Sequence, residues 1–145
     1  MTARVALSTS ECRELLESGV VGRVAMATPI GPRIVPLNYW VHGDAIVFRT
    51  APYSQLSSYG WDTDLAFEVD DYDLETQAAW SVVAIGRAHV IEDPHRVQRI
   101  RREHELLPWA PGSRNLFVEL IWRELTGVRL GNAWTSAAAM ERSTG

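Results

Sequence analysis

The chain has 145 residues, of which 46% are hydrophobic and 22% are charged, and its formal net charge is −4 at pH 7. This length suits a single domain with an ordinary hydrophobic core, and the composition is typical of a soluble globular protein rather than a disordered or fibrous one. A net acidic chain is a poor candidate for a dedicated nucleic-acid binder, which needs a concentrated positive field. We expect one domain over residues 1–145, with its core at 10–130 and a tail at 133–145.

The absence of lysine and the presence of a single cysteine exclude several kinds of catalytic and metal site. All 14 basic residues are arginines, so chemistry that depends on lysine, such as a Schiff base or a P-loop lysine, is excluded. The single cysteine, Cys12, can form neither an internal disulfide nor a zinc cluster. No apolar run has signal-peptide or membrane-spanning length. We therefore expect a cytoplasmic protein with neither a membrane nor a nucleic-acid partner.

A helix and a β-meander are predicted for the first fifty residues. Ser8 and Glu11 have the spacing of a capping box, and Gly19 ends the helix, on whose apolar face Cys12 lies as a buried structural thiol. Pro36 requires that its strand lies at a sheet edge or contains a bulge. The three strands are expected at residues 22–28, 33–41 and 45–50.

Three further strands and a second long helix are predicted for the rest of the chain. Gly86 falls inside the long fifth strand and predicts a bulge or a close neighbouring backbone. Asp93 and Pro94 are expected to be the N-cap and the first residue of the helix. One face of that helix is formed by Val97, Ile100, His104 and Leu107. The other elements are a helical turn at 54–59, strands at 65–69, 80–91 and 116–125, an acidic connection at 70–73 and a loop at 108–115.

Six strands with two helices set apart from them favour a mainly β fold, a closed or split barrel, over a βαβ sheet. The sequence lacks the motifs of serine hydrolases, P-loop NTPases and Rossmann proteins. We predict no metal site, because the four histidines lack metal-ligand spacing and the acidic run at 70–73 lacks the glycine and distal glutamate of a calcium loop.

A basic stretch lies on the second helix, at Arg96, Arg99, Arg101 and Arg102. Acidic residues interrupt it, and we interpret it as an exposed helical face that points away from the apolar stripe. A patch that binds an anion or a nucleic acid is the alternative interpretation.

One strand end has the residue types of a phosphate pocket. Alternation along residues 45–50 places Val47 and Arg49 on one face of the strand, and Ile46, Phe48 and Thr50 on the other. A guanidinium with hydroxyls on both sides of a turn, here Thr50 and Ser54, can hold a phosphate. From spacing alone, an ordinary strand end beside a polar loop is the alternative.

Six segments in chain order carry a family resemblance over about residues 10–130. They are Glu11-Cys12 with Leu15-Leu16, Gly22-Arg23-Val24-Ala25, Val35-Pro36-Leu37-Asn38-Tyr39, Gly43 to Thr50, Phe67-Glu68-Val69-Asp70 and Trp80 to Ala88. Each is unspecific by itself, but their order and spacing resemble the pyridoxamine 5′-phosphate oxidase-like, FMN-binding split-barrel proteins. The chain looks like the small actinobacterial-type members of that family.

The resemblance implies a homodimer that holds FMN, or in some branches a deazaflavin, in a groove between subunits. The cofactor-binding set that it implies is Pro36, Leu37, Asn38, Tyr39, Phe48, Arg49, Thr50, Ser54, Gln55, Trp80 and Ser81. Of these, Arg49, Thr50 and Ser54 would hold the phosphate, residues 36–39 would lie along the flavin ring, and Trp80 and Ser81 would border the site from either subunit. Tyr39 would donate a proton near the ring or stack on it.

The implied function is a flavin-dependent oxidoreductase that acts on an unidentified small molecule. A non-catalytic carrier of flavin, deazaflavin, haem or another tetrapyrrole is the alternative on the same fold, and a ligand-free dimerisation domain is a third possibility. The sequence departs from the family at Gln55, where a lysine is usual, at Ala79, where a glycine is usual, and at Gly127-Val128-Arg129, where glycine and arginine are usually adjacent. Gln55 removes a positive charge from the implied phosphate site, which leaves open a weak flavin site, a different cofactor or an empty groove.

Overall fold

The computed structural model of the protein describes residues 4–51, 54–61, 63–103 and 116–131, with all their side chains except that of Gln55. These residues form eight strands and three helices. The strands are β1 (Arg4–Ala6), β2 (Val21–Thr28), β3 (Gly31–Asn38), β4 (Trp40–His42), β5 (Ala45–Thr50), β6 (Asp64–Asp73), β7 (Ala78–Val90) and β8 (Leu116–Leu130), and the helices are α1 (Thr9–Ser18), α2 (Gln55–Tyr59) and α3 (Pro94–Glu103).

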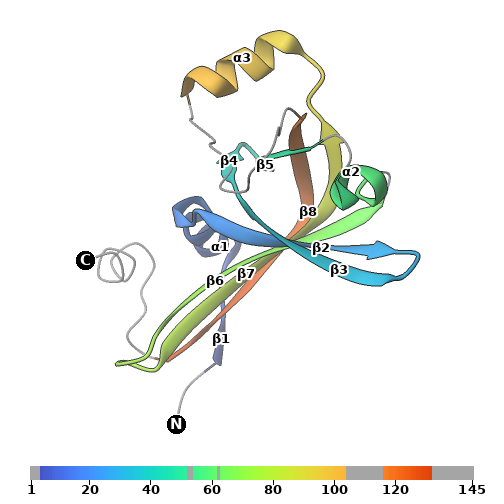
Figure 1. Cartoon of the computed structure of the whole chain (residues 1–145). Coiled ribbons are helices and arrows are strands. Elements are labelled where there is room, and N and C mark those ends of the chain that lie inside the picture. Colours follow the sequence, from blue (N-terminus) through green and yellow to red (C-terminus); the bar gives the residue numbers. More distant parts are fainter. Residues whose placement is uncertain (1–3, 52–53, 62, 104–115, 132–145) are drawn as a thin grey trace.

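The strands form one antiparallel sheet in the order β3-β2-β6-β7-β8-β5-β4, with β1 added alongside β8. The sheet curls strongly, and the long strands β6, β7 and β8 run diagonally through the whole molecule (Figure 1). Because β3 and β4 remain separate edges, the sheet curls without closing. The predicted mainly β, split-barrel fold is confirmed.

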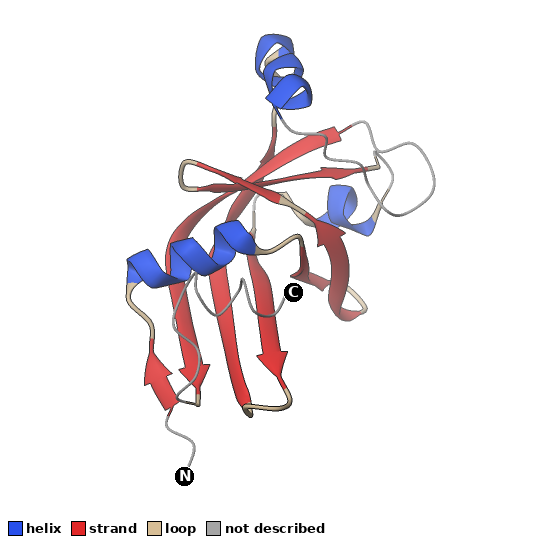
Figure 2. Cartoon of the chain, turned by 90° about the vertical axis from the view of Figure 1, so that its left-hand side faces the viewer, coloured by secondary structure: helices blue, strands red, loops and turns tan. Residues whose placement is uncertain are grey.

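The main core lies on the concave side of this sheet. Alternation along the strands sends Phe48, Phe67 and Val82 to this side, where all three are fully buried. Helix α1 lies across the long strands in Figure 2 and packs its apolar face, including Cys12, into the same core. A Cβ added at Gly127 of β8 would lie 2.9 Å from the Cys12 sulfur, so the glycine lets α1 approach the sheet. We call this side of the sheet the core face and the opposite side the outer face.

Local signals in the sequence are confirmed at three positions. Ser8 caps α1 by accepting a hydrogen bond from the Glu11 amide at 3.2 Å. Pro36 lies on β3, which is an edge strand. At Gly86 the register between β7 and β8 shifts, and a Cβ there would lie only 2.0 Å from the carbonyl oxygen of Ile121, so the bulge and the close backbone both occur.

Several element boundaries were predicted wrongly. The strand expected at 33–41 is two strands, because the chain breaks at Tyr39, whose side chain turns into the core. The acidic segment 70–73 is part of β6 rather than a connection, since the ladder to β7 continues as far as Asp73. Strand β8 extends to Leu130 and pairs there with β1, a strand of three exposed residues that no local pattern indicated.

Helix α3 packs on the outer face, at the β5 end of β8. Asp93 starts it as predicted, accepting a hydrogen bond from the His95 amide at 2.9 Å. Ile100 is buried with Val47, Ile91 and Phe117, and the side chains of Arg96 and Arg101 reach β8 as well. The prediction that the whole basic stretch points away from the apolar stripe is therefore wrong for these two arginines.

His104 and Leu107, the loop at 108–115 and the tail at 133–145 lie outside the described residues. Within the described part of the chain, no helix is long and apolar enough to cross a membrane.

Candidate functional site

A pocket of about 230 Å³ lies against the free ends of β6, β7 and β8. Its lining residues are Asp70, Asp71, Tyr72, Ala79, Trp80, Ser81, Val128 and Leu130. Most of them project from the outer face, because Ser81 pairs with Asp70 and Val128, and Ala79 pairs with Tyr72 and Leu130. Among the described residues, no helix covers this end of the outer face, since α1 and α2 pack on the core face and α3 on the opposite end.

The pocket combines an apolar wall with a small number of polar groups. Ala79, Val128 and Leu130 supply the wall, and the Tyr72 ring stands beside it with 64% of its surface exposed. The Ser81 hydroxyl is only half-buried and has no hydrogen-bond partner among the residues that the structure describes. A flat aromatic ligand needs this combination of an apolar surface and a few groups that can bond its edge.

Trp80 lies between the pocket and the core. It lines the pocket, yet its side chain is only 3% exposed and belongs to the main core cluster. Within the described part of the chain, its indole N–H is buried and meets no acceptor. A buried donor of this kind costs free energy unless water or a ligand supplies the acceptor.

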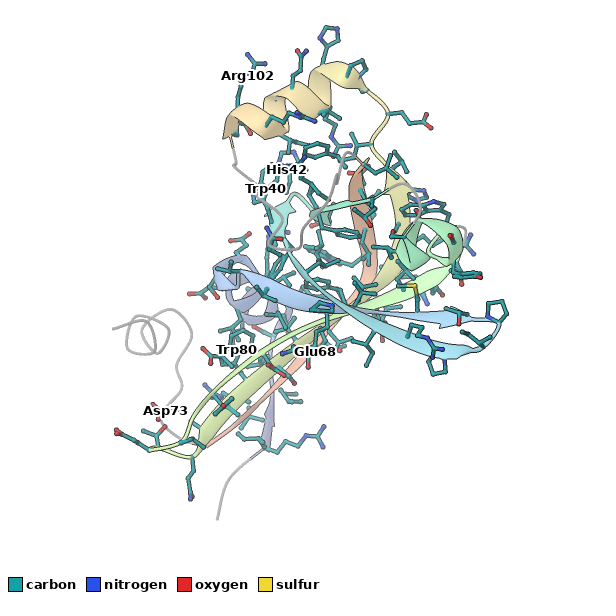
Figure 3. The ribbon with its side chains drawn as sticks, in the orientation of Figure 1. Trp40, His42, Glu68, Asp73, Trp80 and Arg102 are labelled. Carbon is teal, nitrogen blue, oxygen red and sulfur yellow. The ribbon has the colours of Figure 1, made fainter. Side chains whose placement is uncertain are left out.

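Charged groups continue from the pocket along the outer face. Arg23 on β2 lies 2.8 Å from the Glu68 carboxylate and 3.6 Å from that of Asp70, both on β6. Burial raises the pKa of Glu68, Asp70 raises it further, and Arg23 opposes both effects. Figure 3 shows Glu68 and Trp80 on the same long arm of the sheet, far from Arg102 on α3. On its β2 side, the pocket therefore borders a cluster of charged groups formed by Glu68, Asp70 and Arg23.

The predicted phosphate residues lie at the other end of the sheet, where β5 ends. Thr50 is buried, and its hydroxyl lies 2.8 Å from that of Ser54. Ser54 also caps α2 by accepting a hydrogen bond from the Ser57 amide. These two hydroxyls contact each other on the core side of the strand, on both sides of the turn. Gln55 is the first residue of α2, and its side chain is not described.

Arg49 points to the outer face, opposite Thr50. Its guanidinium carbon lies 5.0 Å from the centre of the Phe117 ring on β8. The predicted alternation of β5 is thus confirmed, with Val47 in the cluster beneath α3 and Ile46 and Phe48 in the main core. Arg49 lies on the outer side of β5, and the Thr50–Ser54 pair lies on its core side. A single phosphate would therefore have to sit beyond the end of the strand to contact all three residues.

The two predicted parts of the site are far apart within one chain. Ser81 pairs with Val128, whereas Arg49 pairs with Phe117 on the same strand β8. At roughly 3.3 Å per residue, these two positions lie about 35 Å apart along β8. One chain does not bring Trp80 and Ser81 to the Arg49 end of the sheet.

The remaining predicted residues divide between the two faces. Pro36 and Asn38 project from the outer face of β3, beside the position of Arg23 and Val21 on β2. Leu37 packs against the core, and Phe48 is completely buried there. Tyr39 is 5% exposed, its ring contacts Phe67 edge-on at 4.7 Å, and its hydroxyl bonds the Leu16 carbonyl.

The predicted site set contained only two of the eight residues that line the pocket, Trp80 and Ser81. Asp71 and Tyr72 were assigned to a connection, and Val128 and Leu130 lie beyond the predicted end of the last strand. Tyr72 could have indicated the pocket from the sequence, because it is an aromatic residue two positions after Asp70 and lies on the same side of an extended chain. Among the described residues there is no group of three or more histidine, cysteine or acidic side chains that could hold a metal ion.

Comparison with known proteins identifies the class. Residues 8–129 match the family model described as pyridoxamine 5′-phosphate oxidase. The uncharacterized protein Rv0080 of Mycobacterium tuberculosis is 31% identical over 131 residues, which cover 87% of this chain and 85% of that protein. The chain belongs to the pyridoxamine 5′-phosphate oxidase-like family, as its sequence predicted.

Two solved structures from actinobacteria resemble this one over most of their length. An FAD binding protein from Mycobacterium smegmatis is 30% identical, with a TM-score of 0.75, over 88% of this chain and 99% of that chain. A putative pyridoxamine 5′-phosphate oxidase from Corynebacterium glutamicum is 29% identical, also with a TM-score of 0.75, over 91% of this chain and 96% of that chain. The split-barrel architecture is therefore shared with flavin-binding members of the family.

Proposed function

We propose that two copies of this chain bind FMN between their outer faces and carry out a flavin-dependent redox reaction on a small molecule. The observation that carries the proposal is the outer-face pocket, which no helix of the described residues covers, with its apolar wall and half-buried Ser81 hydroxyl. These residues suit the flat ring of a flavin. Membership of the family, and the name of the FAD binding relative, support a flavin as the ligand.

The separation of the two half-sites supports a homodimer. The pocket occupies one end of the outer face, and Arg49 occupies the other end, about 35 Å away along β8 at roughly 3.3 Å per residue. A two-fold axis that runs across the strands, at right angles to β8, would bring one end of the outer face to the opposite end of the partner's face. Such an arrangement brings Ser81 of one copy toward Arg49 of the other, at two equivalent sites.

Bound FMN would supply the exchange of hydride or single electrons with the substrate, while the protein positions and shields it. In the proposed site, Arg49, Thr50, Ser54 and Gln55 hold the phosphate end. Pro36 and Asn38, together with the backbone of residues 36–39, lie along the ring. Leu37, Tyr39 and Phe48 support these positions from the core, because their side chains are packed there. Trp80 and Ser81 border the ring, and Tyr72 and Leu130 exclude water from the mouth of the pocket.

Titration with FMN tests the proposal directly. We expect the wild-type protein to bind FMN with a characteristic change in its visible spectrum, and Ser81→Ala to weaken binding by about fivefold, the value of one neutral hydrogen bond. Thr126→Ala is the matched control, because Thr126 lies on the same outer face but outside the pocket. Equal effects of the two variants would contradict the proposed position of the ring.

A second experiment separates a redox enzyme from a carrier. Under anaerobic conditions, a nicotinamide donor should bleach the flavin of an oxidoreductase, and an acceptor should restore its colour. A carrier of flavin, deazaflavin, haem or another tetrapyrrole would bind its ligand without this cycle, and a dimerisation domain would bind none. Sedimentation tests the dimer, since a mass near that of one 16.2 kDa chain at micromolar concentration would contradict it.

A further inference from the structure

The two ends of the molecule carry opposite charges. Residues 70–77, which form the turn from β6 into β7 and which we call the acidic hairpin, contain four acidic residues and no basic one. Helix α3, at the other end, contains four arginines and a single acidic residue, Glu103. Figure 3 shows Asp73 at the free end of the long arm and Arg102 on α3, at opposite ends of the molecule.

Three of the four arginines of α3 present their charge to solvent. They lie in the second half of the helix, away from its acidic cap, and all three are exposed: Arg99, Arg101 and Arg102. None of them forms an ion pair with any residue that the structure describes. Arg101 lies 5.1 Å from the centre of the Phe117 ring, a contact that orients the guanidinium without neutralising it. The second half of α3 is therefore a basic surface.

The acidic hairpin is charged in the opposite sense. The Asp73 carboxylate accepts a hydrogen bond from the Glu75 amide at 2.9 Å, which holds the turn in shape but leaves the negative charge in place. Glu75 is exposed, and neither of these carboxylates forms an ion pair with a residue in the described part of the chain. Leu74, between them, is 81% exposed and adds an apolar side chain to the same tip.

The two charged surfaces cannot meet within one chain. Ser81 marks the hairpin end of the sheet, and Arg49 marks the α3 end, since Arg49 and Arg101 contact the same Phe117 ring. These ends lie about 35 Å apart along β8 at roughly 3.3 Å per residue. A partner with one sign of charge would match only one of the two surfaces. A second copy of this chain matches both at once, because each copy carries both.

We propose that the acidic hairpin of one copy docks against the second half of α3 in another copy, at two equivalent contacts. The inference rests on the dimer of the proposed function. A two-fold axis at right angles to β8, which would bring Ser81 of one copy toward Arg49 of the other, would also bring the hairpin of one copy toward α3 of the other. Complementary charge then selects this orientation, because copies that overlap like end on like end place charges of the same sign together.

Reversal of single charges tests the contact. Glu75→Arg and Arg102→Glu should each raise the dissociation constant of the dimer about tenfold, because each turns attraction into repulsion at both contacts. The combined variant Glu75→Arg/Arg102→Glu exchanges the two charges and should regain most of the wild-type affinity. Sedimentation at low ionic strength measures these constants, and the differences should shrink as salt screens the charges.

A matched control and a second variant guard against damage to the fold. Arg33→Glu makes the same charge reversal on the core side of β3, where Arg33 pairs with the buried Met26, and it should leave the dissociation constant unchanged. Arg99→Glu repeats the test at another exposed position of α3 and should weaken the dimer as Arg102→Glu does. The thermal midpoint of each variant reports whether it is folded.

The outcomes separate the contact from the function on which it rests. If the wild type is a dimer that binds FMN, and the reversals act no more strongly than Arg33→Glu or the combined variant is not restored, the contact is refuted while the function stands. If the charge exchange behaves as expected but the dimer binds no flavin, the function fails and the contact stands. A wild type that stays monomeric would overturn the contact and the dimer, while FMN titration would still test flavin binding separately.

Discussion

The hydroxyl of Tyr39 donates a hydrogen bond to the backbone carbonyl of Leu16, at a distance of 2.5 Å. The bond ties the break between β3 and β4 to the last turn of α1, and it is buried in the core. The same carbonyl accepts a weaker bond from the Gly19 amide at 3.4 Å. A side chain held in this way stabilises the fold, and the structure gives no support to Tyr39 as a proton donor near a flavin.

The stability of the protein should depend on Tyr39 at alkaline pH. Burial raises the pKa of Tyr39 above its ordinary value of 10.0. The folded state therefore retains a proton that the unfolded state loses, so this contribution to stability is complete below about pH 10 and declines above it. Urea unfolding between about pH 8 and pH 11 should show a shallower decline for Tyr39→Phe than for the wild type.

At neutral pH, Tyr39→Phe should lower the free energy of unfolding by about 1 kcal/mol, the typical value of one hydrogen bond. Tyr72→Phe is the matched control, because the Tyr72 side chain is 64% exposed. Identical pH dependence for the two variants would contradict the assignment.

The bulge between β7 and β8 should tolerate no side chain at Gly86. The 2.0 Å separation between an added Cβ and the Ile121 carbonyl oxygen involves backbone atoms, which cannot rotate away. We expect Gly86→Ala to lower the free energy of unfolding by about 3 kcal/mol or more. Gly43→Ala is the control for backbone strain alone, because Gly43 has a φ of +60° and an added Cβ there would meet nothing within 4 Å. We expect this substitution to lower the free energy of unfolding by about 1 kcal/mol. Chemical denaturation of both variants makes the comparison, and equal losses would contradict the close contact.

The ion pair between Arg96 and Glu119 should stabilise the attachment of α3. Its side chains are 31% and 15% exposed, which makes it less screened than a surface pair. A double-mutant cycle with Arg96→Gln and Glu119→Gln should give a coupling energy of about 1 kcal/mol. The pair between Arg123 and Asp64 is the reference, with exposed fractions of 57% and 48%, and its coupling should stay below about 0.5 kcal/mol. Comparable couplings for the two pairs would show that burial does not strengthen the first.

Restoring a lysine at Gln55 should strengthen FMN binding. Gln55 begins α2, directly after the Thr50–Ser54 hydroxyl pair, so a lysine there adds a positive charge close to the end of β5. A charge-assisted bond is roughly twice as strong as a neutral one, and Gln55→Lys should raise FMN affinity by about five- to tenfold. The gain should shrink as the salt concentration rises, and riboflavin affinity should not change. Fluorescence titration at two salt concentrations tests this, and an unchanged FMN affinity would place residue 55 away from the phosphate.

The parts of the fold that depend on local signals could be predicted from the sequence. The cap at Ser8, the edge position of Pro36 and the bulge at Gly86 each follow from the chemistry of one or two residues. The failures involve partners that are distant in the sequence. The strand β1 exists because the far end of β8 offers it an edge, and the acidic end of β6 is extended because β7 pairs with it.

For the candidate site too, local features could be predicted from the sequence and contacts between distant residues could not. Alternation correctly placed Arg49 and Thr50 on opposite sides of β5, whereas the contact between the Thr50 and Ser54 hydroxyls was not predicted. The position of Arg101 over Phe117 was not predictable, because helical periodicity assigned the arginines of α3 to solvent. Tertiary packing placed one turn of that helix against β8, a contact between residues that are distant in sequence.

The two prolines of the edge strand β3 determine how the sheet can grow. Pro32 and Pro36 pair with β2 at positions four residues apart, so the nitrogens of both face the open side of β3 and carry no proton to donate. A strand from another molecule that docked there would lack N–H donors at Pro32 and Pro36, so edge-to-edge growth of the sheet is disfavoured at this strand. Copies that meet through the same surface on each form a closed pair, whereas copies that join one edge to a different edge can add further units without limit.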